Sequence, residues 1–229
     1  MRPDNNIKVN GARLWDSLME MAEIGATPKG GVNRLTLTDP DRESRDLFVR
    51  WCKAAGCSIT VDRMGSIFAR RGGADDSLPP VMLGSHLDTQ PTGGKFDGAL
   101  GVLAALEAVR RLNDLDIRTK HPLEITMWTN EEGSRFAPPM VASGVFAGVF
   151  ALDWSLQRTD ADGNVFGKEL ERIGYAGQAT VGGRPVHAYF ELEVNIEPDL
   201  DPRVELMNTE GPITTLTCEI APQAGIRDR

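Results

Sequence analysis

VMLGSHLDTQPTGGKFD, residues 81–97, is the stretch around which the rest of the chain is arranged. Its apolar run 81–83 predicts a buried strand that leads into a glycine-rich loop carrying one imidazole and several carboxylates. Residues 98–113 (GALGVLAALEAVRRLN) then repeat apolar side chains on one helical face, and residues 123–128 (LEITMW) predict a second strand. Strand, loop, helix and strand in this order predict a βαβ unit with a parallel strand pair.

The other segments place this unit in an α/β fold. Apolar spacing predicts helices over residues 11–24 and after residues 38–40 (TDP), where a capping side chain precedes proline. Residues 58–62 and 66–70 predict a hairpin, and residues 186–192 predict a further strand. We expect a mixed, mainly parallel sheet with helices on both faces and antiparallel strands at its edge.

Composition limits the classes of partner. The 229 residues carry a net charge of −8, which argues against a nucleic-acid or anionic-membrane partner and says little else; the small-molecule substrate that we expect follows from motifs described below. The N-terminus lacks the apolar core of a signal peptide, and no uncharged run is long enough to span a bilayer, so we expect a cytoplasmic protein. Cys52, Cys57 and Cys218 show no CxxC spacing and are expected to be buried, reduced thiols.

Five polar residues follow the two strands of the βαβ unit: His86, Asp88, Asp97, Glu131 and Glu132. Ligand sites of open α/β sheets form beyond the carboxyl ends of the strands, so these side chains are expected to converge. Mixed imidazole and carboxylate ligands suit zinc, manganese or cobalt better than calcium. A pair of such ions can lower the pKa of water to roughly 7 and polarise a carbonyl group.

Each residue suggests a role in such a site. His86 offers a neutral imidazole, and Asp88 could accept its other N–H and fix the tautomer. Asp97 could bridge two ions at the start of the 98–113 helix. We expect Glu131 and Glu132 to lie on extended backbone with diverging side chains, so that one could bind metal while the other takes a proton from water.

Structural alternatives stay open for each of these residues taken alone. His86 could be a hydrogen-bonded loop histidine, and Asp97 the N-cap of its helix. Asp88 could be an Asx-turn residue, and the Glu131–Glu132 pair a solvated turn. Only their expected convergence favours a metal site.

Other motifs are weaker. Before a helix expected near residues 165–173, four side chains fall at positions 1, 3, 5 and 12 of a calcium loop: Asp160, Asp162, Asn164 and Glu171. Position 6, which calcium loops reserve for glycine, is Val165, so we do not expect calcium. His121 is expected in a surface loop and His187 in a packed strand. The chain has no GxSxG, HExxH or P-loop motif.

At these residues the sequence resembles the dinuclear amidohydrolases that include N-carbamoyl-L-amino-acid hydrolase, β-ureidopropionase and allantoate amidohydrolase. The resemblance runs from about residue 12 to residue 192, through GSHLDTQPTGGKFDGALGVLAALE, TNEEGSRFAPPMVASGVFAG and GGRPVHAYFEL. It implies a zinc-exopeptidase-like catalytic domain that holds two divalent ions (zinc, manganese or cobalt). It also implies cleavage of an N-carbamoyl amino acid to the amino acid, carbon dioxide and ammonia.

The same resemblance assigns roles. It implies that His86 binds one ion, that Asp97 bridges both and that Glu132 binds the other. It implies Glu131 as the general base and Asp88 as the residue that supports His86.

One segment departs from the family. Where the family has a histidine ligand within HIEQGP, residues 193–198 read EVNIEP, and no histidine follows His187. The family's lid and dimerisation domain, through which it forms homodimers, and its last histidine ligand are not found either. We therefore expect residues 1–192 to be the N-terminal portion of the catalytic domain and residues 193–229 to be an irregular tail of a truncated or frameshifted product.

The departure has consequences for the metal. Each ion would lack one protein ligand, which predicts impaired metal occupancy unless Glu193, Asn195 or Glu197 substitutes. A non-catalytic remnant of the family, and an aminoacylase or peptidase of the same superfamily, are the alternative functions.

Overall fold

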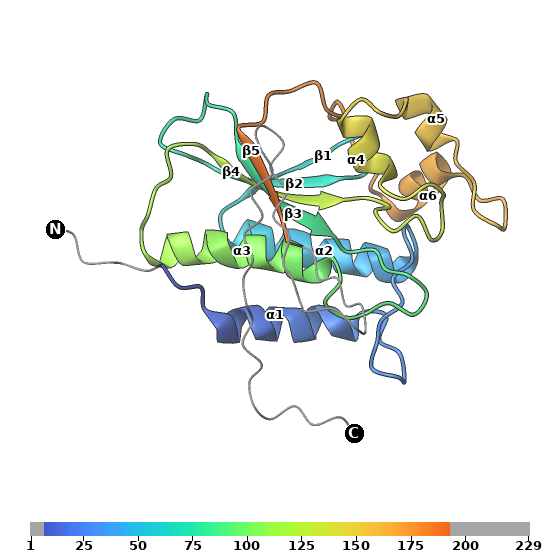
Figure 1. Cartoon of the computed structure of the whole chain (residues 1–229), viewed down its shortest axis with the longest axis horizontal. Coiled ribbons are helices and arrows are strands. Elements are labelled where there is room, and N and C mark those ends of the chain that lie inside the picture. Colours follow the sequence, from blue (N-terminus) through green and yellow to red (C-terminus); the bar gives the residue numbers. More distant parts are fainter. Residues whose placement is uncertain (1–6, 193–229) are drawn as a thin grey trace, which may run out of the picture.

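A mixed β-sheet organises the part of the chain that the computed structural model describes, residues 7–192 (Figure 1). In sheet order, its five strands are β1 (Ser58–Val61), β2 (Ile67–Arg71), β4 (Leu123–Trp128), β3 (Val81–His86) and β5 (Ala188–Glu191). β3 pairs in parallel with both β4 and β5, whereas the β1–β2 and β2–β4 pairs are antiparallel. The predicted α/β class, with a parallel centre and an antiparallel edge, is confirmed.

The βαβ unit lies at the centre of this sheet. Helix α3 (Ala99–Asp114) carries the chain from β3 back to β4 and packs directly against β3. The parallel register sets His86 beside Trp128, so both strands end at the same edge. Gly84 permits this pairing because a Cβ atom there would overlap the carbonyl oxygen of Thr126.

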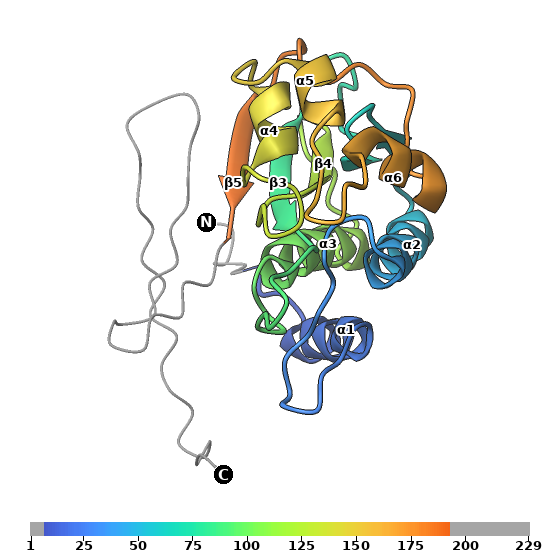
Figure 2. The ribbon, with the colours of Figure 1, turned by 90° about the vertical axis from the view of Figure 1, so that its right-hand side faces the viewer.

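Three helices lie on one side of the sheet, as Figures 1 and 2 show: α2 (Asp39–Ala54) and α3 pack against the strands, and α1 (Gly11–Glu23) packs against α3. Successive strand residues point to opposite faces, so Leu123, Ile125 and Met127 of β4 enter this core together. On α3, residues such as Val102 and Leu106 meet them and are fully buried. This apolar layer holds α3, and with it the loop before α3, against the sheet.

The opposite face carries a smaller aromatic cluster. Phe68 and Trp128 contact each other edge to face at 5.8 Å, and Phe146 at the end of α4 (Val141–Phe146) packs on both rings. Helices therefore contribute to both faces, as predicted. α5 (Leu152–Leu156) and α6 (Phe166–Ile173) lie beside α4 and share a core around Phe136.

Several local predictions can be compared with these elements. Thr38 is the N-cap of α2, but it makes no side-chain capping bond, because its hydroxyl donates to the carbonyl of Leu35 at 2.6 Å. Cys52 and Cys57 are free and buried as expected, whereas Cys218 lies outside the described residues. Within residues 7–192, no helix has the length and apolarity needed to cross a bilayer.

Candidate metal centre

His86 closes β3 and is the most buried member of the candidate site, at 3% exposure. Its Nδ1 atom lies 2.8 Å from the main-chain carbonyl of Asp88. A carbonyl can only accept a hydrogen bond, so Nδ1 carries the proton and Nε2 is directed to the remaining polar groups. Burial acts to lower the pKa of His86, but the carboxylates of Asp88 and Glu131 outweigh it and raise that pKa above its ordinary value.

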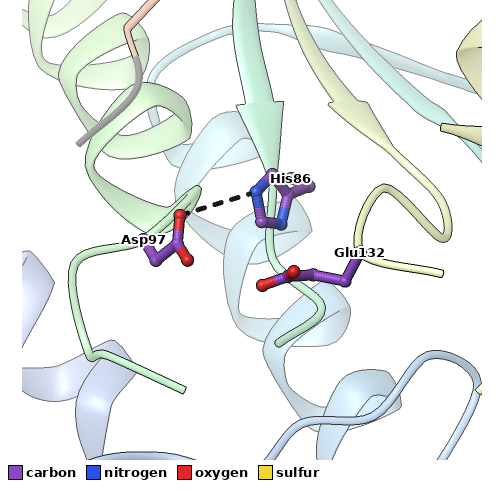
Figure 3. A group of neighbouring side chains, drawn as sticks. All are labelled: His86, Asp97 and Glu132. Atoms are coloured by element: carbon purple, nitrogen blue, oxygen red, sulfur yellow. Dashed lines mark ion pairs between the residues drawn. The ribbon is translucent and has the colours of Figure 1, made fainter. Parts of the chain in front are cut away.

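Asp97 reaches the imidazole from the loop before α3. Its Oδ1 lies 3.9 Å from Nε2 of His86, the contact drawn in Figure 3. The N-cap of α3 is Gly98 rather than Asp97, and no side chain caps this helix. The structural alternative of Asp97 as a helix cap is therefore wrong. Gly98 has a φ of 61°, and a Cβ atom there would lie 2.5 Å from the imidazole ring.

The two glutamates follow β4, but not on extended backbone as we predicted. Asn130 has a left-handed φ of 58°, and the chain bends through Glu131 and Glu132. Both carboxylates consequently approach the imidazole instead of diverging. Oε2 of Glu131 lies 3.4 Å from Nε2 of His86. An oxygen of Glu132 lies within 4.8 Å of the ligand atoms of His86 and Asp97.

The residues present fit a divalent cation. His86, Asp97 and Glu132 offer one imidazole nitrogen and two carboxylates within 4.8 Å of one another, a donor set typical of zinc, manganese or cobalt (Figure 3). Oε1 of Glu132 is buried and has no hydrogen-bond partner among the described residues, while Gln90 donates to Oε2 at 3.1 Å. Burial raises the pKa of Glu132, and a nearby cation would lower that pKa again by stabilising the ionised carboxylate.

Asp88 lies behind the cluster, and its carboxylate does not do what we predicted. The main-chain carbonyl of Asp88 contacts His86, whereas its carboxylate stays 3.9 Å from Nδ1. That carboxylate instead accepts the main-chain N–H groups of Glu131 and Glu132, each at 3.3 Å, and the hydroxyl of Thr36 at 2.7 Å. Because Asp88 follows His86 by two residues, its main-chain carbonyl can face the imidazole ring while its side chain faces the loop of Glu131 and Glu132.

Comparison with known proteins is consistent with this geometry. The model of peptidase family M20/M25/M40 matches residues 82–223, more than half of the chain. The chain belongs to this family. Members of the M20 family are metal-dependent hydrolases, and the fold, with its cluster at the ends of β3 and β4, agrees with that membership.

Individual relatives are similar over most of this chain but extend well beyond it. An N-carbamoyl-L-amino-acid amidohydrolase from Rhizobium meliloti is 59% identical over 87% of this chain and 48% of its own length. A ureidoglycolate hydrolase from Arabidopsis thaliana is 34% identical over 75% of this chain and 37% of its own length. The crystal structure of a hydantoinase/carbamoylase family amidase from Burkholderia multivorans has a TM-score of 0.83 and 63% identity, covering 85% of this chain and 47% of that one. This M20 chain thus spans about half the length of the curated relatives it matches.

Residues that the sequence did not single out support the M20 site from behind. Arg34, Thr36 and Arg135 are buried or nearly so, and each donates or accepts hydrogen bonds at the loops that carry the site residues. Arg45 forms a fully buried ion pair with Asp41 and donates to Thr129, just before the two glutamates. No motif marks them. The one signal in the sequence concerns Arg34, which stands among the apolar residues Val32, Leu35 and Leu37, a setting unusual for a solvated loop.

The calcium-like loop and the other two histidines lie outside the candidate metal centre. Asp160 binds Arg135 and the loop's own N–H groups, as expected for a turn rather than a calcium site. His121 and His187 stack with ring centroids 3.9 Å apart at the far end of the M20 sheet, and His121 contacts Pro79. His187 lies just before β5 (Ala188–Glu191) and is exposed, so its predicted place in a packed strand is wrong. The possible substitute ligands lie outside the described residues, as does part of the family match: Glu193, Asn195 and Glu197.

Proposed function

We propose that this chain provides metal-binding residues of a metal-dependent amidohydrolase that cleaves the carbamoyl C–N bond of N-carbamoyl amino acids. The observation that carries the proposal is the convergence of His86, Asp97 and Glu132, with Glu131 beside them, at one edge of the sheet. Several relatives are N-carbamoyl-L-amino-acid amidohydrolases, which supports the substrate class. We place the catalytic domain's N-terminal portion in residues 1–192.

In this proposal each side chain has one task. His86 would hold one divalent ion through Nε2, Glu132 would hold a second through its partly buried carboxylate, and Asp97 would be shared between them. When bound, two such ions would acidify water and polarise the scissile carbonyl. Zinc, manganese and cobalt are the candidate ions. Free, buried Cys52 and Cys57 suit the reducing cytoplasm that we propose as its compartment.

Glu131 is the proposed general base. Its side chain is partly exposed at 22%, and its Oε2 lies 3.4 Å from Nε2 of His86, the atom proposed to hold an ion. It would take the proton from that water and deliver it to the leaving nitrogen, which departs with the C–N electron pair. Hydrolysis then yields the amino acid, carbon dioxide and ammonia.

The sequence also supports a second candidate, a metal-poor protein without turnover. Residues 193–198 read EVNIEP where the related enzymes are expected to have a histidine ligand. Metal content per purified chain separates the two candidates: zinc or manganese at near one or two equivalents supports the enzyme. A metal-free chain that leaves N-carbamoyl amino acids intact after metal addition supports the remnant.

Two matched variants test the roles within the enzyme. Glu131→Gln should keep its metal while kcat falls by roughly 10²–10⁴-fold, because a glutamine cannot accept the proton. Glu132→Gln should instead bind metal at least ~10-fold more weakly, since a ligand has lost its charge. Equal kcat in wild type and Glu131→Gln would remove Glu131 from the mechanism. An aminoacylase would be indicated if N-acetyl amino acids were cleaved faster than N-carbamoyl ones.

A further inference from the structure

Thr36 is a buried residue, 2% exposed, that touches both segments bearing the candidate metal site. Its hydroxyl donates to Oδ2 of Asp88 at 2.7 Å, in the segment that begins with His86. Its main-chain carbonyl accepts a hydrogen bond from Nη1 of Arg135 at 2.9 Å, in the segment that begins with Glu131. These segments are far apart in sequence, and Thr36 joins them from a third.

The hydroxyl contact matters because of what Asp88 does next. The same carboxylate accepts the main-chain N–H groups of Glu131 and Glu132 at 3.3 Å each. These two bonds are long for N–H···O contacts, whereas the bond from Thr36 has the favourable length of an O–H···O bond, which makes it the strongest of the three. The torsion of the Asp88 side chain, and hence the position of both amides, is therefore set chiefly by Thr36.

The backbone around Thr36 is held firmly enough to act as a reference. On one side, Arg34 exchanges two hydrogen bonds with Thr89, through its N–H at 2.8 Å and its carbonyl at 3.0 Å. On the other, the N–H of Leu37, which has a left-handed φ of 61°, donates to the buried carboxylate of Asp41 at 2.7 Å. Because the backbone is held on both sides of Thr36, its hydroxyl has a fixed position from which it can orient the Asp88 carboxylate.

We propose that Thr36 is a positioning residue that orients the Asp88 carboxylate and, through it, places Glu131 and Glu132 against His86. Thr36 touches neither substrate nor metal in this scheme. The inference rests on the proposed function for its purpose, but the linkage itself is a property of the chain without any bound ion.

The experiment compares Thr36→Val, which keeps the shape and removes the hydroxyl, with Thr36→Ser, which restores it. Thr126→Val is the matched control, because Thr126 is also fully buried and its hydroxyl has no partner among the described residues. The first readout is amide hydrogen exchange at Glu131 and Glu132 followed by NMR. The second is zinc titration by calorimetry, using zinc alone without substrate.

In Thr36→Val, the amide hydrogens of Glu131 and Glu132 should exchange roughly 10-fold faster, and zinc should bind roughly 10-fold more weakly. In Thr36→Ser and Thr126→Val, both the exchange rates and the zinc affinity should stay near the wild-type values. Exchange at Glu131 and Glu132 that is unchanged in Thr36→Val overturns the inference. The inference is also overturned if Thr126→Val speeds amide exchange and weakens zinc binding as much as Thr36→Val does, because that would indicate a general loss of core packing. If Thr36→Val does not fold, Thr36→Ala is compared with Thr36→Ser by the same exchange measurement. If wild type binds no zinc, the proposed function fails while the exchange data still decide the role of Thr36.

Discussion

Nδ1 of His86 donates to the main-chain carbonyl of Asp88, and the carboxylate of that same residue serves a different loop. The imidazole tautomer is thus fixed by backbone, which no side-chain substitution at residue 88 removes directly. The carboxylate has the separate task of holding the two glutamate amides. These tasks can be separated by substitution.

Asp88→Asn and Asp88→Ala should differ in metal binding but not in the tautomer of His86. Asparagine keeps one acceptor for the glutamate amides, whereas alanine leaves both without one. We expect zinc affinity to fall about 10-fold in the first variant and about 100-fold in the second. ¹⁵N NMR of the imidazole at pH 8 should find the proton on Nδ1 in both. A proton moved to Nε2 in Asp88→Asn would contradict this division of roles.

Gly98→Ala should disable the site by steric overlap. The added Cβ would lie 2.5 Å from the ring of His86, at a φ of 61° that costs an alanine about 1–2 kcal/mol. We expect the free energy of unfolding to fall by about 2 kcal/mol or more and zinc binding to be lost. Gly94→Ala, in the same loop with nothing within 4 Å of its Cβ, should change stability by no more than about 0.5 kcal/mol. Equal effects of the two substitutions in urea unfolding would refute this explanation.

Much of this arrangement could be predicted because long apolar patterns determine it. The 98–113 periodicity and the strand at 123–128 indicated the parallel pair, and the pair determined which edge bears His86 and the glutamates. The direction of the glutamate side chains could not be predicted, since it depends on one left-handed residue, Asn130. Helices α4 and α5 span six and five residues, too few to show a period. The support from Thr36 and Arg34 depends on contacts distant in sequence.

Asp62 should make stability fall as pH rises toward neutrality. Burial raises its pKa to about 7, and its Oδ2 is buried without a partner among the described residues. Between about pH 4 and pH 7 the native state keeps this proton while the unfolded chain releases it, so this stabilising contribution is complete below pH 4 and is lost through pH 7. Asp62→Asn should remove that part of the slope, worth on the order of a few kcal/mol.

The measurement is urea unfolding of both proteins from pH 4 to pH 8. The asparagine introduced by Asp62→Asn retains a side-chain oxygen for the main-chain N–H groups of Met64 and Ser66, which Oδ1 of Asp62 accepts at 2.9 Å. The difference between the two proteins should therefore change with pH. A constant offset would show that Asp62 is ionised throughout this range.

Arg45→Met should be among the most destabilising single substitutions, because it leaves Asp41 buried without its cation. The two side chains are fully buried and 3.0 Å apart, and losing one partner of such a pair costs about 3–5 kcal/mol. Adding Asp41→Asn should recover part of the loss. As a control, Lys168→Met breaks an exposed pair with Glu171 and should change the free energy of unfolding by less than about 1 kcal/mol. Similar costs for Arg45→Met and Lys168→Met in urea would contradict this ranking.

The close approach of Gly84 to Thr126 leaves no space between β3 and β4 for any larger residue. A register shift of one residue between the strands would displace His86 by about 3.3 Å along the strand relative to Glu131. It would also place the imidazole ring on the opposite face of the sheet. Cation capture thus depends on alignment along two neighbouring strands as much as on the side chains at their tips. A substitution that shifts this register should therefore weaken binding of a divalent ion even though every side chain that would hold the ion is kept.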